Sequence, residues 1–328
     1  MHPHRPCHTL TVTTLTTALK NRATELGFDL VGVAEAGASQ TVAHLRSWLA
    51  EGRHGAMEWM AKTESVRKHP RNVLPGCRSV IAVAMSYRTD HPPSSDLIDR
   101  PEGRVWVSRY AWGRDYHSVM KKKLVRLGRW LEQQHPEARW RACVDTVPVL
   151  EREWAARAGL GWIGKNTSLL NRKLGSELFL GVLLTDVELV ADKAVTDHCG
   201  RCTACLDACP THAILAPRLL DARRCIAYLT VEHRGPVNPA FHSSMGSMVA
   251  GCDICQEVCP WTLKAPAGLH PEFEPTDARY RPRLADLESM DEEAFRRWRA
   301  GSPLGRIPYP QFRRSLAIAR ENQHDRDP

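Results

Sequence analysis

The sequence has no long apolar segment. None of its 328 residues lies in a run of eighteen apolar residues, so no membrane-spanning helix is expected. The N-terminus has no apolar block either, because His2, His4 and Arg5 lead into a threonine-rich stretch, and it carries no twin-arginine export signal. We therefore expect a cytoplasmic protein, whose eleven cysteines stay reduced and suit metal binding or catalysis better than disulfides.

Signatures of nucleotide binding are also missing. No GxGxxG follows a predicted strand, and no P-loop is present. The nearest glycine-rich stretch, residues 159–167, follows a predicted helix, which argues against a nicotinamide site of the Rossmann type.

The spacing of apolar residues predicts an α+β protein that begins with an α/β domain. Helices are expected over residues 13–26, 117–134 and 149–157 and after a cap at Ser39, and strands over residues 30–34, 79–86, 141–146 and 177–184, with a loop over 92–101. Two more helices are expected at 284–300 and 311–320. The predicted division is a flexible tail (1–12), the α/β domain (13–190), a cysteine-rich domain (191–270) and a small helical segment (271–328).

Most of the cysteines follow the spacing of a bacterial ferredoxin. One run, ending at Pro210, reads CxxCxxCxxxCP, and a second, ending at Pro260, reads CxxCxxxCP and is one cysteine short. Cys225 lies between the two runs and supplies the eighth cysteine ligand that two clusters need. In ferredoxins the last cysteine of each run binds the other cluster, so two [4Fe–4S] clusters are predicted. The first set of ligands is Cys199, Cys202, Cys205 and Cys259, and the second set is Cys209, Cys225, Cys252 and Cys255.

A structural zinc site in an RNA-binding protein is the alternative interpretation, because CxxC pairs also bind zinc. Zinc sites need neither the third cysteine of the run nor the two CP endings, so iron–sulfur clusters are favoured. Metal analysis that found about two zinc ions and no iron would select the alternative. The remaining Cys7, Cys77 and Cys143 are expected to be small core or tail residues without a role.

Two clusters form an electron relay that must end at a redox centre, and long motifs suggest which one. The sequence resembles the epoxyqueuosine reductase family over nearly its whole length, in residues 109–117, 143–152, 159–167, 199–210, 225–235 and 251–260. The resemblance implies a nitroreductase-like or reductive-dehalogenase-like cobalamin-binding domain, a ferredoxin-like domain with two [4Fe–4S] clusters and a C-terminal HEAT-like segment. It implies reduction of epoxyqueuosine at wobble position 34 of tRNA, the last step of queuosine synthesis. An external low-potential electron donor and a monomer are expected.

Asp145 matches the family's proton donor to the departing epoxide oxygen. Because it lies at an apolar strand end beside Val144 and Val147, we expect burial to raise its pKa and keep the carboxyl protonated at neutral pH. The residues alone leave open a second role, in which Asp145 caps the helix that follows Pro148.

The resemblance implies base-off cobalamin with no protein ligand on cobalt. The residues expected to contact it are Ser108, Arg109, Tyr110, Asp145, Lys165, Asn166, Thr167 and Ser168. Enzymes that place a histidine on cobalt use DxHxxG. Here Asp115 and His117 match that motif but Met120 replaces the glycine, so His117 is interpreted as a capping or surface histidine.

A formal charge of +8 fits a phosphate-rich partner, here the tRNA anticodon loop. The predicted tRNA contacts flank the ligand Cys225 and are Arg223, Arg224, His233 and Arg234. Arginines of the C-terminal segment are expected to add to them, whereas the lysines of residues 121–123 are interpreted as a solvated helix face.

Two rival functions remain open at this point. A reductive dehalogenase combines the same cofactors with an organohalide substrate, although its respiratory members carry the export signal that is missing here. An electron-transfer ferredoxin with an accessory domain would need no cobalamin, and a protein that never takes up cobalamin would favour it.

Overall fold

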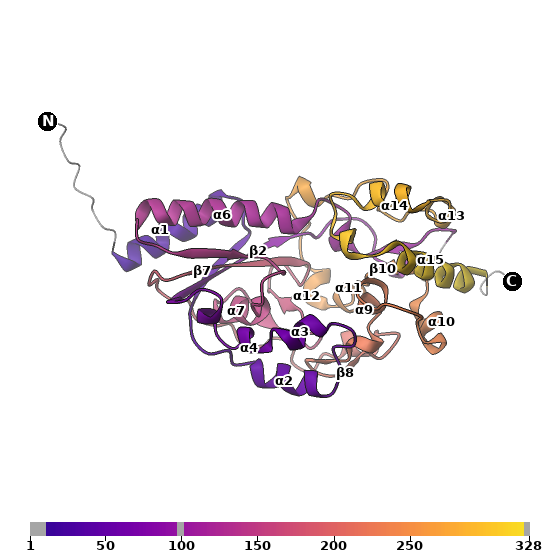
Figure 1. Ribbon diagram of the computed structural model, residues 1–328, viewed down its shortest axis with the longest axis horizontal. Helices are drawn as coiled ribbons and strands as arrows, with labels where there is room; N and C mark the ends of the chain where they lie inside the picture. The colour runs from indigo at the N-terminus through magenta and orange to yellow at the C-terminus, as the bar shows by residue number, and fades with distance from the viewer. Residues whose placement is uncertain (1–10, 97–101, 325–328) are drawn as a thin grey trace.

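The computed structural model describes residues 11–96 and 102–324 and is built around a four-stranded sheet (Figure 1). Its order is β1 (Leu30–Glu35), β2 (Ser79–Ser86), β7 (Leu178–Thr185) and β4 (Trp140–Cys143). All three pairings are antiparallel. Alternating helices and strands favour a parallel sheet, but the order of elements does not fix which strand edges pair. The antiparallel sheet agrees with the α+β class.

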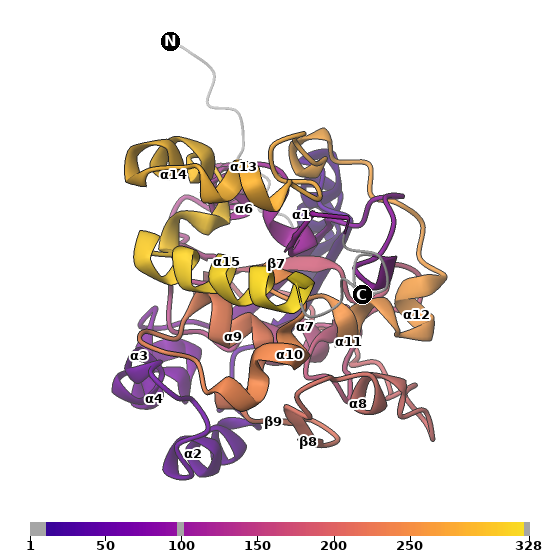
Figure 2. The same cartoon turned by 90° about the vertical axis from the view of Figure 1, so that its right-hand side faces the viewer.

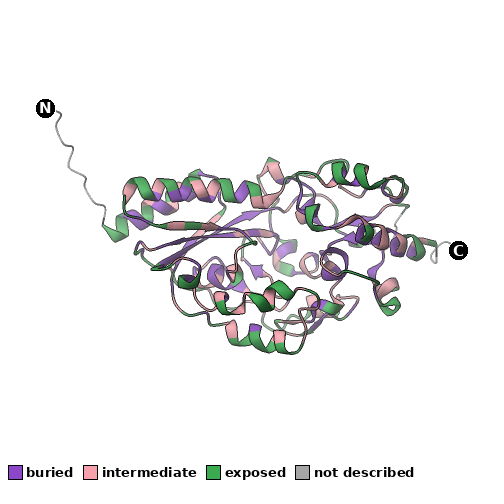
Figure 3. Ribbon diagram, in the orientation of Figure 1, coloured by how far each residue is buried: buried purple, intermediate pink, exposed green. Residues whose placement is uncertain are grey.

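Helices cover both faces of this sheet. Helices α1 (Val12–Glu25) and α6 (Tyr116–Gln134) pack on one face, and α7 (Glu151–Arg157) packs on the other. Val83 and Leu183 point towards α1 and α6, whereas their neighbours Ala82 and Val182 point towards α7, as the two-residue period of a strand requires. The central strands β2 and β7 are therefore largely buried, while the outer sides of α1 and α6 are exposed (Figure 3).

Three short helices form an arm between β1 and β2: α2 (Val42–Ala50), α3 (Glu58–Lys62) and α4 (Glu64–Arg67). Thr41, not the expected Ser39, is the N-cap residue of α2. The Ser39 hydroxyl instead donates to Glu153 Oε2 of α7 at 2.6 Å, and the amide of Gln40 donates to Glu153 Oε1 at 2.7 Å. Buried Glu153 thereby ties the arm to α7.

The cysteine-rich part consists of short elements. Its helices are α8 (Ala204–Asp207), α9 (Ile226–Val231), α10 (His242–Met245), α11 (Ile254–Glu257) and α12 (Pro260–Leu263), and its strands are β8 (Ile214–Ala216), β9 (Leu219–Leu220) and β10 (Met248–Ala250). Strand β10 pairs in parallel with β3 (Trp106–Val107), which lies far earlier in the chain. Backbone hydrogen bonds therefore join the cysteine-rich part to the preceding domain. Within that preceding domain, β5 (Trp162–Ile163) pairs with β6 (Leu169–Leu170).

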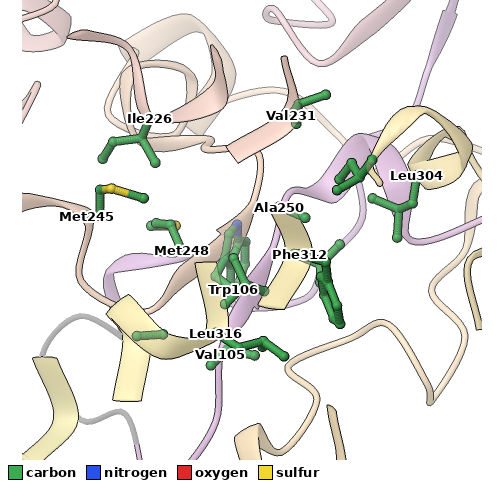
Figure 4. Packing of buried hydrophobic residues seen from close by; sticks show 14 of the residues in the cluster. Val105, Trp106, Ile226, Val231, Met245, Met248, Ala250, Leu304, Phe312 and Leu316 are labelled. Carbon is green, nitrogen blue, oxygen red and sulfur yellow. The ribbon is translucent and has the colours of Figure 1, made fainter. Parts of the chain in front are cut away.

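The C-terminal segment contains α13 (Leu284–Glu288), α14 (Glu292–Arg299) and α15 (Tyr309–His324). The expected helix over 284–300 is broken, because Asp291 caps α14 by accepting from the amide of Ala294 at 2.7 Å. Figure 4 shows Trp106, Met248 and Phe312 in one buried cluster, so all three predicted domains share this core. The boundaries at 190 and 270 and the HEAT-like assignment stay predictions.

Helix α1 begins at Val12, so the predicted tail ends earlier than expected, and residues 1–10 lie outside the described part of the chain. The predicted loop over 92–101 also lies partly outside it, since residues 97–101 are not described. Within the described ranges, no helix has the length and apolar character needed to cross a membrane.

Candidate functional site

A cavity of about 610 Å³ lies beside β7, the arm of α2–α4 and the loop that follows β4. Its aromatic lining comes from Trp48, Trp59, Tyr87, Tyr110, Tyr116 and Phe179. Its charged lining comes from Arg67, Asp145, Glu151, Arg152, Glu153 and Arg218. This size and mixture suit a large, mostly apolar ring system that carries a few polar groups.

Asp145 lies in the loop after β4 with a backbone φ of 54°, in the left-handed region. Its Oδ2 atom lies 3.1 Å from Nε2 of His117 and accepts a hydrogen bond from Arg306 Nη1 at 3.4 Å. It does not cap α7, whose N-cap residue is Leu150. The structure therefore excludes the capping role and places the carboxylate between two basic side chains beside the cavity.

His117 connects two carboxylates. Asp115 is the N-cap residue of α6 and accepts from the amide of His117 at 3.0 Å, while its Oδ1 lies 2.7 Å from Nδ1 of the His117 ring. The other ring nitrogen faces Asp145. Burial acts to lower the pKa of His117, but its hydrogen bonds to Asp145 and Asp115 raise the pKa overall. The cap is Asp115, so His117 does not cap the helix; it is half-buried and joins Asp115 to Asp145.

The pKa of Asp145 is lowered, contrary to the expectation from sequence. The hydrogen bond from His117 is the largest cause and outweighs burial, and the positive charges of His117, Arg306 and Arg67 act in the same direction. Burial alone would raise the pKa, as expected, but basic partners from distant parts of the chain reverse its sign. Asp145 is ionised in this arrangement.

Glu151, the first residue of α7, is a second acidic group in the same cavity. Its Oε1 atom is buried and has no hydrogen-bond partner among the described residues. Burial raises the pKa of Glu151 to about 7, and the charge of Asp145 adds to the rise while Arg67 and Arg152 oppose it. The cavity thus holds an ionised carboxylate and a carboxyl group that is partly protonated at neutral pH.

Three of the eight residues predicted to contact cobalamin line this cavity: Tyr110, Asp145 and Thr167. Lys165 and Asn166 instead line a smaller cavity among the cysteines. The structure does not bring the other three into either cavity.

Ser108, Arg109 and Ser168 instead contact residues of the chain. Ser108 donates to Asp253 Oδ1 at 2.5 Å, Arg109 Nε lies 3.1 Å from Glu177 Oε1, and Ser168 hydrogen-bonds through its amide to Asn166. Ser108 and the amide of Arg109 both bind Asp253, next to Cys252, so they support a cysteine loop.

The smaller cavity, of about 240 Å³, is lined by the first set of cysteines, Cys199, Cys202, Cys205 and Cys259. Trp162 Nε1 donates to Cys199 Sγ at 3.4 Å, and Lys165 Nζ donates to the carbonyl oxygens of Gly200 and Cys202 at 2.7 and 2.8 Å. Burial and the charges of the other three thiolates raise the pKa of Cys205 to about 11. Four thiols around one hollow fit a [4Fe–4S] cluster, whose iron charge would stabilise the thiolates.

The second set, Cys209, Cys225, Cys252 and Cys255, is half-buried. Burial raises the pKa of Cys255, and so do the thiolate charges of Cys225 and Cys209 in its own set and of Cys205 in the first. The two sets therefore lie next to each other, which suits an electron relay. Their ligand assignment stays a prediction. In the described residues, no three or more Cys, His, Asp or Glu side chains are arranged to hold a single metal ion.

The other cysteines lie away from both sets. Cys77 and Cys143 are buried between α7 and the sheet, and burial raises the pKa of each thiol. Cys7 lies outside the described residues.

The four predicted tRNA contacts all make contacts within the chain. Arg223 pairs with Asp221 at 2.7 Å, and Arg224 donates to the carbonyl of Thr211 at 3.0 Å. His233 Nε2 lies 2.9 Å from the carbonyl oxygen of Pro236, and Arg234 donates to Gln311 of α15. Arg223 and Arg234 are nevertheless exposed.

Sequence reasoning did not place His117, Glu151 or Arg306 beside Asp145. Two features of the sequence could have pointed to them: His117 belongs to a DxH motif, and Glu151 lies in segment 143–152, which resembles the epoxyqueuosine reductase family. No local pattern marks Arg306, which was expected only as a tail arginine near tRNA.

Comparison with known proteins gives two family matches. The family described as "Epoxyqueuosine reductase QueG, DUF1730" matches residues 67–146, and the "4Fe-4S double cluster binding domain" matches residues 198–262. The chain is 43% identical over 313 residues to the epoxyqueuosine reductase of Synechococcus sp. (strain CC9605), covering 94% of this chain and 95% of the relative. It is 39% identical over 304 residues to that of Escherichia coli (strain K12), covering 93% and 80% of the two chains.

Solved structures point to the same family. A crystal structure of epoxyqueuosine reductase with an epoxyqueuosine-modified tRNA-Tyr stem loop has a TM-score of 0.88 and 30% identity, covering 96% of this chain and 83% of that one. A Bacillus subtilis epoxyqueuosine reductase, with its catalytic aspartate loop swung out of the active site, has a TM-score of 0.86 and 29% identity, covering 96% and 83%. From its sequence, its fold and its relatives, the chain belongs to the epoxyqueuosine reductase family.

Proposed function

We propose that this chain reduces epoxyqueuosine at position 34 of tRNA to queuosine. The observation that carries the proposal is Asp145, held by His117 and Arg306 beside a large cavity, in a chain that aligns with epoxyqueuosine reductases over nearly its whole length. The related structure with a modified stem loop supports tRNA as the substrate.

Removal of the epoxide oxygen as water consumes two electrons and two protons, and different parts of the chain are suited to supply them. When bound, a reduced cobalamin would supply a strongly nucleophilic metal centre for opening the epoxide. Tyr110, Thr167 and residues 178–180 of β7 would hold its ring in the large cavity. Glu151 Oε1, which is buried without a hydrogen-bond partner among the described residues, would hydrogen-bond to an amide group of such a ring or to the substrate.

The first proton comes from the pair of Asp145 and His117. The raised pKa of His117 and the lowered pKa of Asp145 favour a protonated ring beside an ionised carboxylate, with His117 Nε2 3.1 Å from Asp145 Oδ2. We propose that Asp145 passes this proton to the departing oxygen, so that the carboxyl need not be protonated beforehand. Asp115 holds the ring of His117 in the orientation that this transfer needs.

Glu151 supplies the second proton, and the pH dependence tests this role. Because its pKa is about 7, Glu151 loses its proton as the pH rises through that value. We expect wild-type turnover to decline above about pH 7, and Glu151→Gln to be slower by about 10²-fold at low pH and to lack the decline. Single-turnover rates of pre-reduced protein between about pH 5.5 and about pH 9 measure both effects.

The matched control is Glu188→Gln, an exposed carboxylate that pairs with Arg78. Its pH profile should equal that of the wild type. If turnover of Glu151→Gln still declined at the same pH as that of the wild type, the ionising group would be another residue.

Electrons reach the cavity through the two cysteine sets, which we propose as ligands of two [4Fe–4S] clusters. Gly251 directly precedes Cys252, and a methyl group on Gly251 would lie 3.3 Å from the ring of Tyr110. Since Tyr110 lines the large cavity, the second set lies next to the cavity wall. The first set is then the outer end of the relay.

Binding of tRNA should depend steeply on salt, because Arg223, Arg224, His233 and Arg234 are the proposed phosphate contacts. With about three charged arginine contacts, each contributing a slope of about 0.7, affinity for an anticodon stem-loop should fall about 20-fold between 50 and 200 mM salt. Arg223→Ala should reduce that slope by about 0.7. Fluorescence anisotropy at several salt concentrations measures the slope.

Arg129→Ala, which removes an exposed arginine of α6, is the control and should keep the wild-type slope. Binding that does not change with salt would exclude a phosphate-contacting surface of this kind.

The direct test of the function uses anaerobically reconstituted protein with cobalamin, a chemical reductant and a stem-loop that contains epoxyqueuosine. Nucleoside analysis should show queuosine formed in proportion to the reductant consumed. Protein that carries both cofactors but leaves epoxyqueuosine unchanged would overturn the proposal.

A further inference from the structure

We propose that the surface around Cys202 is the docking site of an acidic protein that carries single electrons. Resting on the proposed function, the inference names the partner that delivers electrons to the relay. The electron-entry surface consists of Cys202 and the exposed side chains Lys173, Arg201, Leu263 and Lys264.

Exposure of a cysteine ligand identifies the entry point. Of the ten cysteines in the described part of the chain, Cys202 alone is exposed, while the second set is half-buried and lies towards the large cavity. Electron tunnelling slows exponentially with distance, so a protein donor must approach the relay at its exposed end. A cluster held by the first set would be within reach at Cys202, and a cluster held by the second set would be shielded.

The rim of this surface is positively charged. Lys165 and Lys264 both line the cavity that contains Cys202, and Arg201 precedes Cys202 in the loop. The turn 171–175 carries exposed Lys173 and packs against α12, since a methyl group on Gly175 would lie 2.6 Å from Thr262 Cα. Lys165, Arg201 and Lys264 thus bring positive charge to the Cys202 opening from three segments of the chain, and Lys173 adds a fourth cation on the turn packed against α12.

One nearby carboxylate is offset and the other is outnumbered. Asp197 is paired with Arg218, whereas exposed Asp207, which accepts a hydrogen bond from the hydroxyl of Thr203 at 2.7 Å, keeps its negative charge. It stands against the exposed cations Lys173, Arg201 and Lys264. A ring of exposed cations selects a partner whose own contact face is acidic and accelerates its approach.

The surface also has an apolar part, as protein–protein interfaces do. Leu263, next to Lys264 at the end of α12, is 62% exposed. Next to it, half-buried Trp261 stacks edge-on against Trp162 at a ring distance of 5.4 Å, and Trp162 donates to Cys199. An apolar patch directly over the first set is what a carrier needs to exclude water and bring its cofactor close.

This location leaves the substrate side uncovered. Figure 2 shows α8 and α12, which flank the electron-entry surface, on the opposite side of the molecule from α2, α3 and α4. Residues of α2–α4 line the large cavity. A carrier protein on the electron-entry surface therefore leaves that side of the cavity open to tRNA.

The step is a single electron transfer. A reduced flavodoxin, used as the acidic probe, is oxidised from its anionic hydroquinone to its neutral semiquinone. One [4Fe–4S] cluster is reduced from the 2+ to the 1+ state, and no bond or proton is exchanged. Two such encounters supply the two electrons of one turnover.

Stopped-flow mixing of cluster-loaded protein with reduced flavodoxin tests the proposal. Lys264→Glu and Lys173→Glu should each slow cluster reduction by about tenfold at low salt, and the difference should shrink at high salt. The same variants should weaken flavodoxin binding in a direct binding measurement. Lys122→Glu, with the same charge change on exposed α6, should behave like the wild type.

A parallel reduction by dithionite separates this inference from the proposed function. Dithionite needs no docking site, so it should reduce all variants equally. If dithionite reduced a variant as slowly, relative to the wild type, as flavodoxin does, the substitution would have damaged the clusters, and the docking role would be overturned. Wild-type rates with flavodoxin, or weakened tRNA binding instead of weakened flavodoxin binding, would also overturn it.

Discussion

Asp145→Asn should lower turnover of an epoxyqueuosine-containing stem-loop by about 10²- to 10⁴-fold, the usual contribution of a general acid. Asparagine keeps the size of the side chain but cannot pass a proton from His117 to the departing oxygen. It also leaves His117 with one carboxylate partner instead of two, which should lower the pKa of the ring. Single-turnover rates and an NMR titration of His117 measure the two effects.

Asp186→Asn is the matched control, because Asp186 is also a carboxylate with a lowered pKa: burial acts to raise its pKa, but its hydrogen bonds and ion pair with Arg139 lower it overall. It lies after β7 and outside the cavity lining, so its turnover should equal that of the wild type. Iron content and cobalamin absorption should be unchanged in both variants. Equal turnover of Asp145→Asn and wild type would show that another group protonates the oxygen.

Cys225→Ser should remove one cluster and abolish turnover. Serine hydroxyls are poor ligands for iron, so the second set would keep three thiolates. Iron should fall from about eight to about four atoms per chain, the content of one remaining [4Fe–4S] cluster. Metal analysis and electron paramagnetic resonance of the reduced protein measure the loss, and the stem-loop assay should show no product.

Cys77→Ser provides the control, since Cys77 is buried between α7 and the sheet, away from both sets. It should retain about eight iron atoms. If Cys225→Ser also retained them, the fourth ligand of the second cluster would have to be another residue, and the predicted pairing would be wrong.

Local patterns in the sequence predicted the elements well. The strand over 79–86 is β2 to the residue, and the helix predicted over 117–134 differs from α6 by one residue. Both depend on residues close together in the chain, where a period of 2 or 3.6 decides which side chains share a face. The cysteine spacing acts at the same short range, which is why it pointed to clusters without any knowledge of the fold.

The environment of Asp145 could not be read from the sequence. Its partners His117 and Arg306 lie 28 and 161 positions away, and they meet only because α6 and the C-terminal segment pack beside the loop after β4. A pKa depends on every charge within a few ångströms, whatever its place in the chain. Burial was therefore expected to raise the pKa of Asp145, whereas its assembled partners lower it.

By itself, the sequence determined the helices and strands, the two cysteine runs and the family, because these are encoded by spacing along the chain and by long matching motifs. Only the tertiary structure decided that the sheet is antiparallel, that Asp145 is ionised beside His117, that Glu151 is a second acid in the same cavity with one carboxyl oxygen buried, and that Cys202 is the exposed cysteine of the described residues. Strand pairing, burial and charge contacts join residues that are distant in the chain, and only packing brings them together.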